Sequence, residues 1–117
     1  MPEPTLQDIT DLSALALSAA IAERRLTCRS VMEAYLSRIE AVNPRLNAIV
    51  SLRPAGELLA EADEADRALA AGEYRGWLHG IPFAVKDLSE AKGLLCSFGS
   101  ANYADFVPDY DDIHVER

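Results

Sequence analysis

The chain has 117 residues, half of them apolar, which is enough for one domain with a hydrophobic core. Its formal net charge is −8, and its eleven basic residues are scattered among nineteen acidic ones. This pattern lacks the clustered basic patch that nucleic acid or an anionic membrane surface requires, and no apolar stretch reaches the ~20 residues that span a bilayer. We therefore expect neither a nucleic-acid partner nor a membrane partner.

The N-terminal residues, the two cysteines and the two histidines indicate the compartment and the metal content of the protein. The first residues, MPEPTLQDITD, have no basic region followed by an apolar one, so they do not form a secretory signal. Cys28 and Cys96 fit neither a metal-type spacing nor a disulfide framework. His79 and His114 lie far apart and belong to no compact ligand motif. We therefore expect a reducing, cytoplasmic location and no bound metal.

Two capped helices are predicted after an extended lead-in over residues 1–11, which carries two prolines. Ser13 is a typical N-cap for a helix over residues 14–25, whose two terminal arginines suit the negative end of the helix dipole. Thr27 is placed to cap a second helix, and Asn43-Pro44 should end it, because proline disfavours the helical conformation of the residue before it. The apolar residues of this second helix recur at helical spacing: Val31, Tyr35, Leu36, Ile39 and Val42.

A strand, a third helix and a second strand follow in the prediction. NAIVSL, residues 47–52, is a short candidate strand. Pro54 suits the first turn of a helix that runs to about Ala71, and Gly72 suits its C-terminal cap. The continuous apolar run Ile81–Val85 is typical of a strand that is covered on both faces. The inward positions expected for the third helix are Leu58, Leu59, Ala62, Ala65 and Leu69.

The order helix, helix, strand, helix, strand predicts an α/β fold. In this prediction N-terminal helices precede the first strands of a mixed sheet, and helices cover that sheet. Residues 1–117 would belong to one domain, divided into the lead-in, a helical part over residues 12–75 and a strand-and-loop part over residues 76–117.

Lys86 stands at the end of the second predicted strand, and the carboxyl ends of strands in α/β sheets collect functional sites. A lysine amine acts as a general base near neutral pH only when its pKa is lowered from ~10.4, which desolvation does. Lys86, at the lip of an apolar run, is therefore a candidate general base. The structural alternative is an ion pair with a nearby acid, or a loop side chain in solvent. The residues alone leave both interpretations open.

The other reactive residues near this segment give weaker signals. Cys96 has no adjacent histidine and is more typical of a small buried thiol than of a nucleophile. His79 is more typical of a polar loop residue than of a catalytic one. Ser89, Ser97 and Ser100 lack the G-x-S-x-G context of an activated serine.

The segment GIPFAVKDLSEAKGLLCSFGS, residues 80–100, resembles the amidase signature family. Upstream, LTCRSVMEAYLSRIEAVNPRLNAIVSL resembles the second helix, the N-P-x-L-N-A turn and the first strand of that family. The resemblance covers about residues 12–117, so it implies an amidase-type mixed sheet. The matching elements are Gly80-Ile81-Pro82, Val85-Lys86-Asp87, Lys92-Gly93-Leu94 and Gly99-Ser100.

The resemblance implies a hydrolase of non-peptide carboxamide bonds with a Ser–cis-Ser–Lys triad and no metal or organic cofactor. Lys86 falls on the family's catalytic lysine. Its neutral amine would accept a proton from the bridging serine, which in turn would deprotonate the nucleophilic serine. A small-molecule amide would then be cleaved through an acyl-enzyme, with release of ammonia or an amine.

The sequence departs from the family pattern in the loop and lacks the serine tract. Leu95-Cys96-Ser97 stands where relatives often have Pro-Thr-Thr, and Leu88-Ser89 stands where Asn is frequent, which affects the substrate more than the class. The 117 residues contain neither a Ser-Ser nor a Gly-Gly pair. The resemblance therefore implies the N-terminal piece of an amidase. Such a piece would be inactive alone and would associate with itself or with the missing C-terminal part.

Two other interpretations stay open from the sequence. A helical interaction module would fold as a monomer without a large apolar patch, whereas an amidase piece would expose a sheet edge and helix faces. The chain could also be part of the amidase-like subunit of a tRNA-dependent amidotransferase, to which its acidic balance gives no support.

Overall fold

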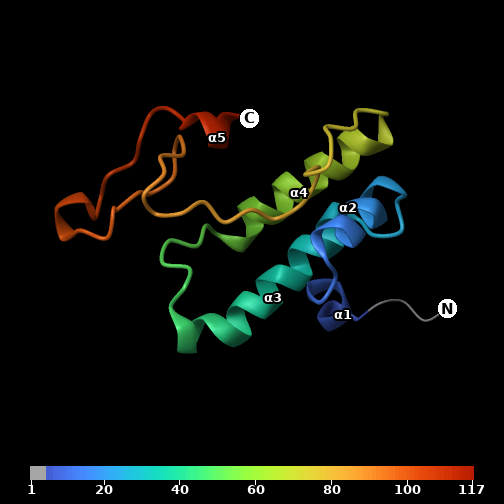
Figure 1. The fold of residues 1–117 in the computed structure, drawn as a ribbon, viewed down its shortest axis with the longest axis horizontal. Coiled ribbons are helices and arrows are strands. Elements are labelled where there is room, and N and C mark those ends of the chain that lie inside the picture. The colour runs from blue at the N-terminus through green and yellow to red at the C-terminus, as the bar shows by residue number, and fades with distance from the viewer. Residues whose placement is uncertain (1–4) are drawn as a thin grey trace. The chain divides into compact units, whose positions relative to one another are not determined.

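The computed structural model describes residues 5–117, which divide into two compact units with their boundary between Pro82 and Phe83. The first unit contains α1 (Leu6–Thr10), α2 (Ala14–Ala22), α3 (Cys28–Leu46) and α4 (Ala55–Ala70). The helices α3 and α4 lie side by side, as Figure 1 shows. The second unit contains the 3₁₀ turn η1 (Ala101–Tyr103) and α5 (Ile113–Glu116), joined by irregular segments.

The predicted α/β fold is wrong, because residues 5–117 contain helices and no strand. A strand exists only through the ladder of hydrogen bonds to its neighbour, and neither residues 47–52 nor residues 81–85 have such a neighbour in the described chain. The backbone of Ile49 instead pairs with one side chain. Asn43 Oδ1 accepts from the Ile49 N–H at 2.9 Å, and Asn43 Nδ2 donates to the Ile49 carbonyl at 2.9 Å.

The predicted helix starts at Ser13 and Thr27 are confirmed. Ser13 Oγ accepts from the Ala16 N–H at 3.2 Å, and Thr27 Oγ1 accepts from the Ser30 N–H at 2.9 Å. The predicted end of the second helix at Asn43-Pro44 is wrong, because α3 continues to Leu46 with Pro44 inside its last turn. The helix closes where the Asn47 N–H donates to the Asn43 carbonyl at 2.7 Å.

The expected extended lead-in contains a short helix within its described part. Thr5 and Asp8 form a capping box for α1, in which the Thr5 N–H donates to Asp8 Oδ2 at 2.8 Å. The Thr-x-x-Asp spacing was a readable signal for this helix start. The part of the expected lead-in over residues 1–4 lies outside the described residues.

The core of the first unit gathers residues from all of its helices around α3, which packs against α1 and α4. Small residues such as Ala34 and Ala62 allow α3 and α4 to approach closely. The helix α4 begins after Pro54 and ends at Ala70, where Gly72 has a positive φ of 85° and the Glu73 N–H donates to the Ala68 carbonyl at 2.9 Å. The buried cluster consists of Ile9, Leu17, Ile21, Cys28, Val31, Ala34 and Ala62.

The N-terminus of α3 is anchored by a carboxylate from α4. Asp66 Oδ1 accepts from the Cys28 N–H at 2.7 Å, and Asp66 Oδ2 accepts from the Arg29 N–H at 3.1 Å. Thr27 Oγ1 accepts from the next amide, that of Ser30, so the first three amides of the helix all have acceptors. The positive end of the α3 dipole is thereby tied to α4.

None of the helices over residues 5–117 combines the length and the apolar composition that crossing a lipid bilayer requires.

Candidate functional site

Lys86 lies near the start of the second unit, in a turn rather than at a strand end. The Ser89 N–H donates to the Lys86 carbonyl at 2.8 Å and closes this turn. The side chain of Lys86 is exposed and forms no ion pair with any residue over 5–117. Of the two structural alternatives for this lysine, the ion pair is thus not formed and the solvated loop position is the one observed.

The apolar run before Lys86 does not bury it within the described chain. Phe83 is 71% exposed, and Ala84 is exposed as well. The expectation of a strand covered on both faces at Ile81–Val85 is therefore wrong for residues 5–117. Desolvation of the Lys86 amine, which general-base chemistry needs, has no source in these residues. The catalytic role of Lys86 stays a prediction.

Asp87, the next residue, accepts hydrogen bonds at both of its carboxylate oxygens. Its Oδ1 accepts from the Ser97 N–H at 2.7 Å, and its Oδ2 accepts a short hydrogen bond from the Ser97 hydroxyl. Its carbonyl accepts from the Phe98 N–H at 3.0 Å. The hydroxyl and the amide of Ser97 lower the pKa of Asp87, because both bonds favour the ionised carboxylate.

Cys96 is a buried thiol beside the same turn, as the sequence predicted. Its Sγ lies 3.5 Å from the Ser89 carbonyl and 3.7 Å from the Asp87 carbonyl. Burial raises the pKa of Cys96, and the nearby carboxylates of Asp87 and Glu90 raise it further. A thiol with a raised pKa is a poor nucleophile, so the role of Cys96 is structural: it packs against the turn that carries Lys86.

Carboxylates also fasten the rest of the second unit. Asp112 Oδ2 accepts from the Glu90 N–H at 2.8 Å, and Asp111 Oδ1 accepts from the Lys92 N–H at 2.6 Å. Three rings, Phe98, Tyr103 and Phe106, pack with centroids 5.2 to 6.0 Å apart. Together with Glu90 these rings line an open hollow of about 250 Å³, which Lys86 does not line.

The serines of the loop have structural partners. Ser97 is held by Asp87, and Ser100 Oγ accepts from the Asn102 N–H at 3.3 Å to cap η1. The pairing of Asp87 with Ser97 was missed by sequence reasoning. No periodicity or cap spacing relates two residues that are ten positions apart.

In the first unit, His79 is buried and structural rather than a polar loop residue. Its Nδ1 accepts from the Arg75 N–H at 3.1 Å, so Nε2 carries the proton that it donates to the Ala65 carbonyl at 2.8 Å. Cys28 is also buried, and burial together with Asp66 raises the pKa of its thiol to about 12. Neither residue is poised for proton transfer or nucleophilic attack.

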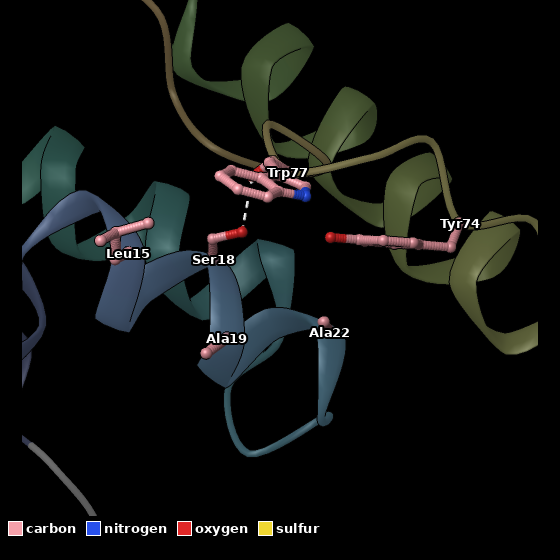
Figure 2. Close-up of a pocket in the computed structure, with 6 residues that line it drawn as sticks. All are labelled: Leu15, Ser18, Ala19, Ala22, Tyr74 and Trp77. Carbon is pink, nitrogen blue, oxygen red and sulfur yellow. Dashed lines mark hydrogen bonds between the residues drawn. The ribbon is translucent and has the colours of Figure 1, made fainter.

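A second hollow lies in the first unit, between α2 and the segment that follows α4 (Figure 2). Its volume is about 170 Å³, and Ser18 Oγ donates to the Trp77 carbonyl across it at 2.7 Å. Figure 2 shows the Tyr74 hydroxyl directed toward Trp77. The lining is Leu15, Ser18, Ala19, Ala22, Tyr74 and Trp77. The lining contains no Asp, Glu, His, Lys or Cys side chain, so the hollow is a recess rather than a catalytic site.

Residues 5–117 hold no group of three or more His, Cys, Asp or Glu side chains arranged to bind a metal ion.

Comparisons with known proteins find relatives over most of the chain. The Amidase family model matches residues 30–117. The acylamidase of Rhodococcus erythropolis is 37% identical over 113 residues, which are 97% of this chain and 24% of the relative. The A-subunit of the glutamyl-tRNA(Gln) amidotransferase of Bdellovibrio bacteriovorus is 39% identical over 110 residues, 94% of this chain and 22% of the relative.

A solved structure agrees with these sequence relatives. The native peptide amidase from Stenotrophomonas maltophilia superposes with a TM-score of 0.79 at 36% identity, covering 92% of this chain and 22% of that one. The chain therefore spans between 22% and 24% of the length of these three relatives.

Proposed function

The chain belongs to the amidase signature family, and from that premise we propose that it supplies the general-base lysine of a carboxamide hydrolase. The observation that carries the proposal is the position of Lys86 in the Val85-Lys86-Asp87 motif, inside the matched residues 30–117. Its amine is exposed and unpaired within the described chain, so it is free to meet a hydroxyl from other polypeptide.

The reaction needs two serines that other polypeptide contributes. The 117 residues contain no Ser-Ser pair, and these relatives of the chain are about four times as long. In the proposed reaction the Lys86 amine takes a proton from a bridging serine, which takes one from the nucleophilic serine. The nucleophile attacks the amide carbon, the C–N bond breaks as the nitrogen is protonated, and water hydrolyses the resulting ester. The added polypeptide would also desolvate the amine.

Exposed apolar side chains support the need for this additional polypeptide. Leu15 is 70% exposed and Trp77 is 74% exposed, and both line the hollow of the first unit in Figure 2. A monomeric interaction module is expected to lack such a patch. The remainder of an amidase fold is the occupant that the length of the relatives favours.

The direct test replaces Lys86 by alanine in the complete polypeptide that joins these residues to the serine-bearing remainder. We expect Lys86→Ala to reduce ammonia release from a primary carboxamide by about 10³-fold or more, because the triad loses its base. Lys92→Ala is the matched control, since Lys92 is the other lysine of the chain and is also exposed. Activity retained in Lys86→Ala, or lost equally in Lys92→Ala, contradicts the proposal.

A second candidate is favoured by the names of several relatives, which are A-subunits of glutamyl-tRNA(Gln) amidotransferases. In that case the chain is part of an amidase-like subunit, and the complete polypeptide supports amide formation on glutamyl-tRNA(Gln) only with partner subunits. Measuring both simple carboxamide hydrolysis and amidation of glutamyl-tRNA(Gln) separates the two functions. Hydrolysis without amidation supports the first, and amidation in the presence of partner subunits supports the second.

A further inference from the structure

We propose that Asp87 and Ser97 act as positioning residues for Lys86, an inference that rests on the proposed function of that lysine. Ser97 binds both carboxylate oxygens of Asp87 through its backbone N–H and its hydroxyl. The two residues thus form a two-point clamp, called here the Asp87–Ser97 clamp, directly after Lys86.

The clamp fixes the backbone that carries the lysine. Lys86 begins the turn that the Ser89 N–H closes on the Lys86 carbonyl at 2.8 Å, and Asp87 is the second residue of this turn. The Phe98 N–H holds the Asp87 carbonyl at 3.0 Å. Cys96 Sγ lies within 3.7 Å of the Asp87 carbonyl and within 3.5 Å of the Ser89 carbonyl. Residues 96–98 therefore contact the turn at both Asp87 and Ser89.

Backbone strain at Phe98, the residue after Ser97, indicates that the contacts around the clamp are strong. Phe98 has a positive φ of 52°, a conformation that is costly for a residue with a side chain. Such a conformation persists only when surrounding contacts compensate for it. Those contacts are the hydrogen bond from the Phe98 N–H to the Asp87 carbonyl and the packing of the Phe98 ring against Tyr103 and Phe106.

The clamp also engages the two carboxylate oxygens that could otherwise pair with the lysine amine. A free carboxylate on the residue after Lys86 would be able to pair with it, and an ion pair favours the protonated amine, which is the wrong form for a base. Both oxygens of Asp87 are instead engaged by Ser97, and the Lys86 side chain has no ion pair in the described chain. Ser97 thereby leaves the amine unpaired while Asp87 holds its backbone.

The experiment uses two substitutions in the clamp, one conservative rescue and one matched control. Asp87→Asn removes the charge, and Ser97→Ala removes the hydroxyl. Ser97→Thr keeps both donors. Asp111→Asn is the control, because Asp111 accepts one backbone amide, that of Lys92, in the same unit without touching the Lys86 turn.

The first measurement is amide hydrogen exchange in the 117-residue chain, which requires no activity. We expect Asp87→Asn and Ser97→Ala to speed exchange at the Ser89 amide by about tenfold, because that amide closes the Lys86 turn. Ser97→Thr should restore protection, and Asp111→Asn should speed exchange at Lys92 alone. Unchanged exchange at Ser89 in both clamp variants overturns the inference whatever the chain catalyses.

The second measurement is steady-state hydrolysis by the complete polypeptide. We expect the two clamp variants to lose about 10- to 100-fold in kcat with little change in KM, because a displaced base harms the transition state rather than substrate binding. The acidic limb of their pH profile, on which activity rises as the lysine loses its proton, should shift, and Ser97→Thr should recover most of kcat. If Lys86→Ala is inactive while both clamp variants are fully active, this inference alone is overturned. If Lys86→Ala is active, the proposed function is overturned.

Discussion

The two units of the chain are stabilised by different kinds of contact. The first is built from helices around a buried cluster, in which α3 contacts α1 and α4 (Figure 1). The second has only η1 and α5 as regular elements and is fastened by carboxylates that accept backbone amides. Its fully buried residues are only Ala91, Cys96 and Pro108, and three rings pack beside them.

The two kinds of contact do different things: one stabilises the folded chain, and the other positions a particular stretch of backbone. Helix packing buries apolar area and contributes most of the free energy of folding in the first unit. Carboxylate-to-amide bonds bury little area but fix individual backbone atoms, which is what a loop that carries a functional side chain requires. The predicted catalytic lysine lies in the second unit, where the loss of a few contacts is enough to misplace it.

Gly80→Ala should give the largest loss of stability and should act entirely on the first unit. A Cβ at residue 80 would lie 2.2 Å from Cys28 Sγ and 2.9 Å from Cys28 Cβ, and Gly80 has a positive φ of 72°. Overpacking and the left-handed conformation together should lower the free energy of unfolding by about 3 kcal/mol. Urea unfolding followed by circular dichroism measures it.

The control for Gly80 is Gly56→Ala in the first turn of α4, where an added Cβ meets nothing within 4 Å. Alanine there should raise the free energy of unfolding by about 0.5 kcal/mol, because glycine is the poorer helix former. Equal effects of the two substitutions would show that the contact between Gly80 and Cys28 does not limit the packing of the first unit.

Asp66→Ala should give the next largest effect, also in the first unit. The substitution leaves the Cys28 and Arg29 amides without their acceptor at the positive end of the α3 dipole. Charged hydrogen bonds of this kind contribute about 2 kcal/mol, and we expect a loss of that size in chemical unfolding. Amide exchange should locate the loss at the start of α3.

Asp63→Ala on the same helix is the matched control for Asp66. Asp63 pairs with Arg29 Nη1 at 2.7 Å, but both side chains are exposed. Exposed ion pairs contribute little, so a change within about 0.5 kcal/mol is expected. If the two aspartates cost the same, the anchoring of α3 by α4 is no stronger than a surface contact.

Features that depend on neighbours in sequence could be predicted. The caps at Ser13 and Thr27 act over three residues, and both are present. The helical spacing of Val31 correctly indicated a buried face. The Thr5–Asp8 box was equally local and readable, although the two prolines before it favoured an extended lead-in instead.

Features that depend on distant partners could not be predicted. The two expected strands need neighbours that residues 5–117 do not provide, so their apolar runs stay irregular. The anchor from Asp66 to Cys28 spans 38 positions, and the Asp87–Ser97 clamp spans ten, without any periodic signal. The family motif identified Lys86 as the candidate base, whereas its exposure follows from the absence of covering residues in this part of the chain.

The smallest expected effect concerns acid, and it compares one carboxylate in each unit. Asp8 accepts from the Thr5 hydroxyl at 2.6 Å and from the Thr5 N–H at 2.8 Å, and these bonds lower the pKa of Asp8 from its ordinary 3.8. Asp87 has a lowered pKa through the equivalent pair of bonds from Ser97. A carboxylate whose pKa is lowered by folding stabilises the folded state above its unfolded pKa, and this contribution is lost as pH falls through the folded pKa.

The difference between the wild type and Asp8→Asn should therefore be present at neutral pH and shrink below about pH 4, and the same should hold for Asp87→Asn. Amide exchange at Thr5 and at Ser97, whose N–H groups donate to these carboxylates, measures each effect locally. The Asp8 effect should stay within α1, because its bonds span three residues, whereas the Asp87 effect should reach Ser89 and Phe98 across the loop. An Asp87→Asn effect confined to Ser97 would mean that the second unit is as local in its contacts as the helix start, and that Lys86 is positioned by some other group.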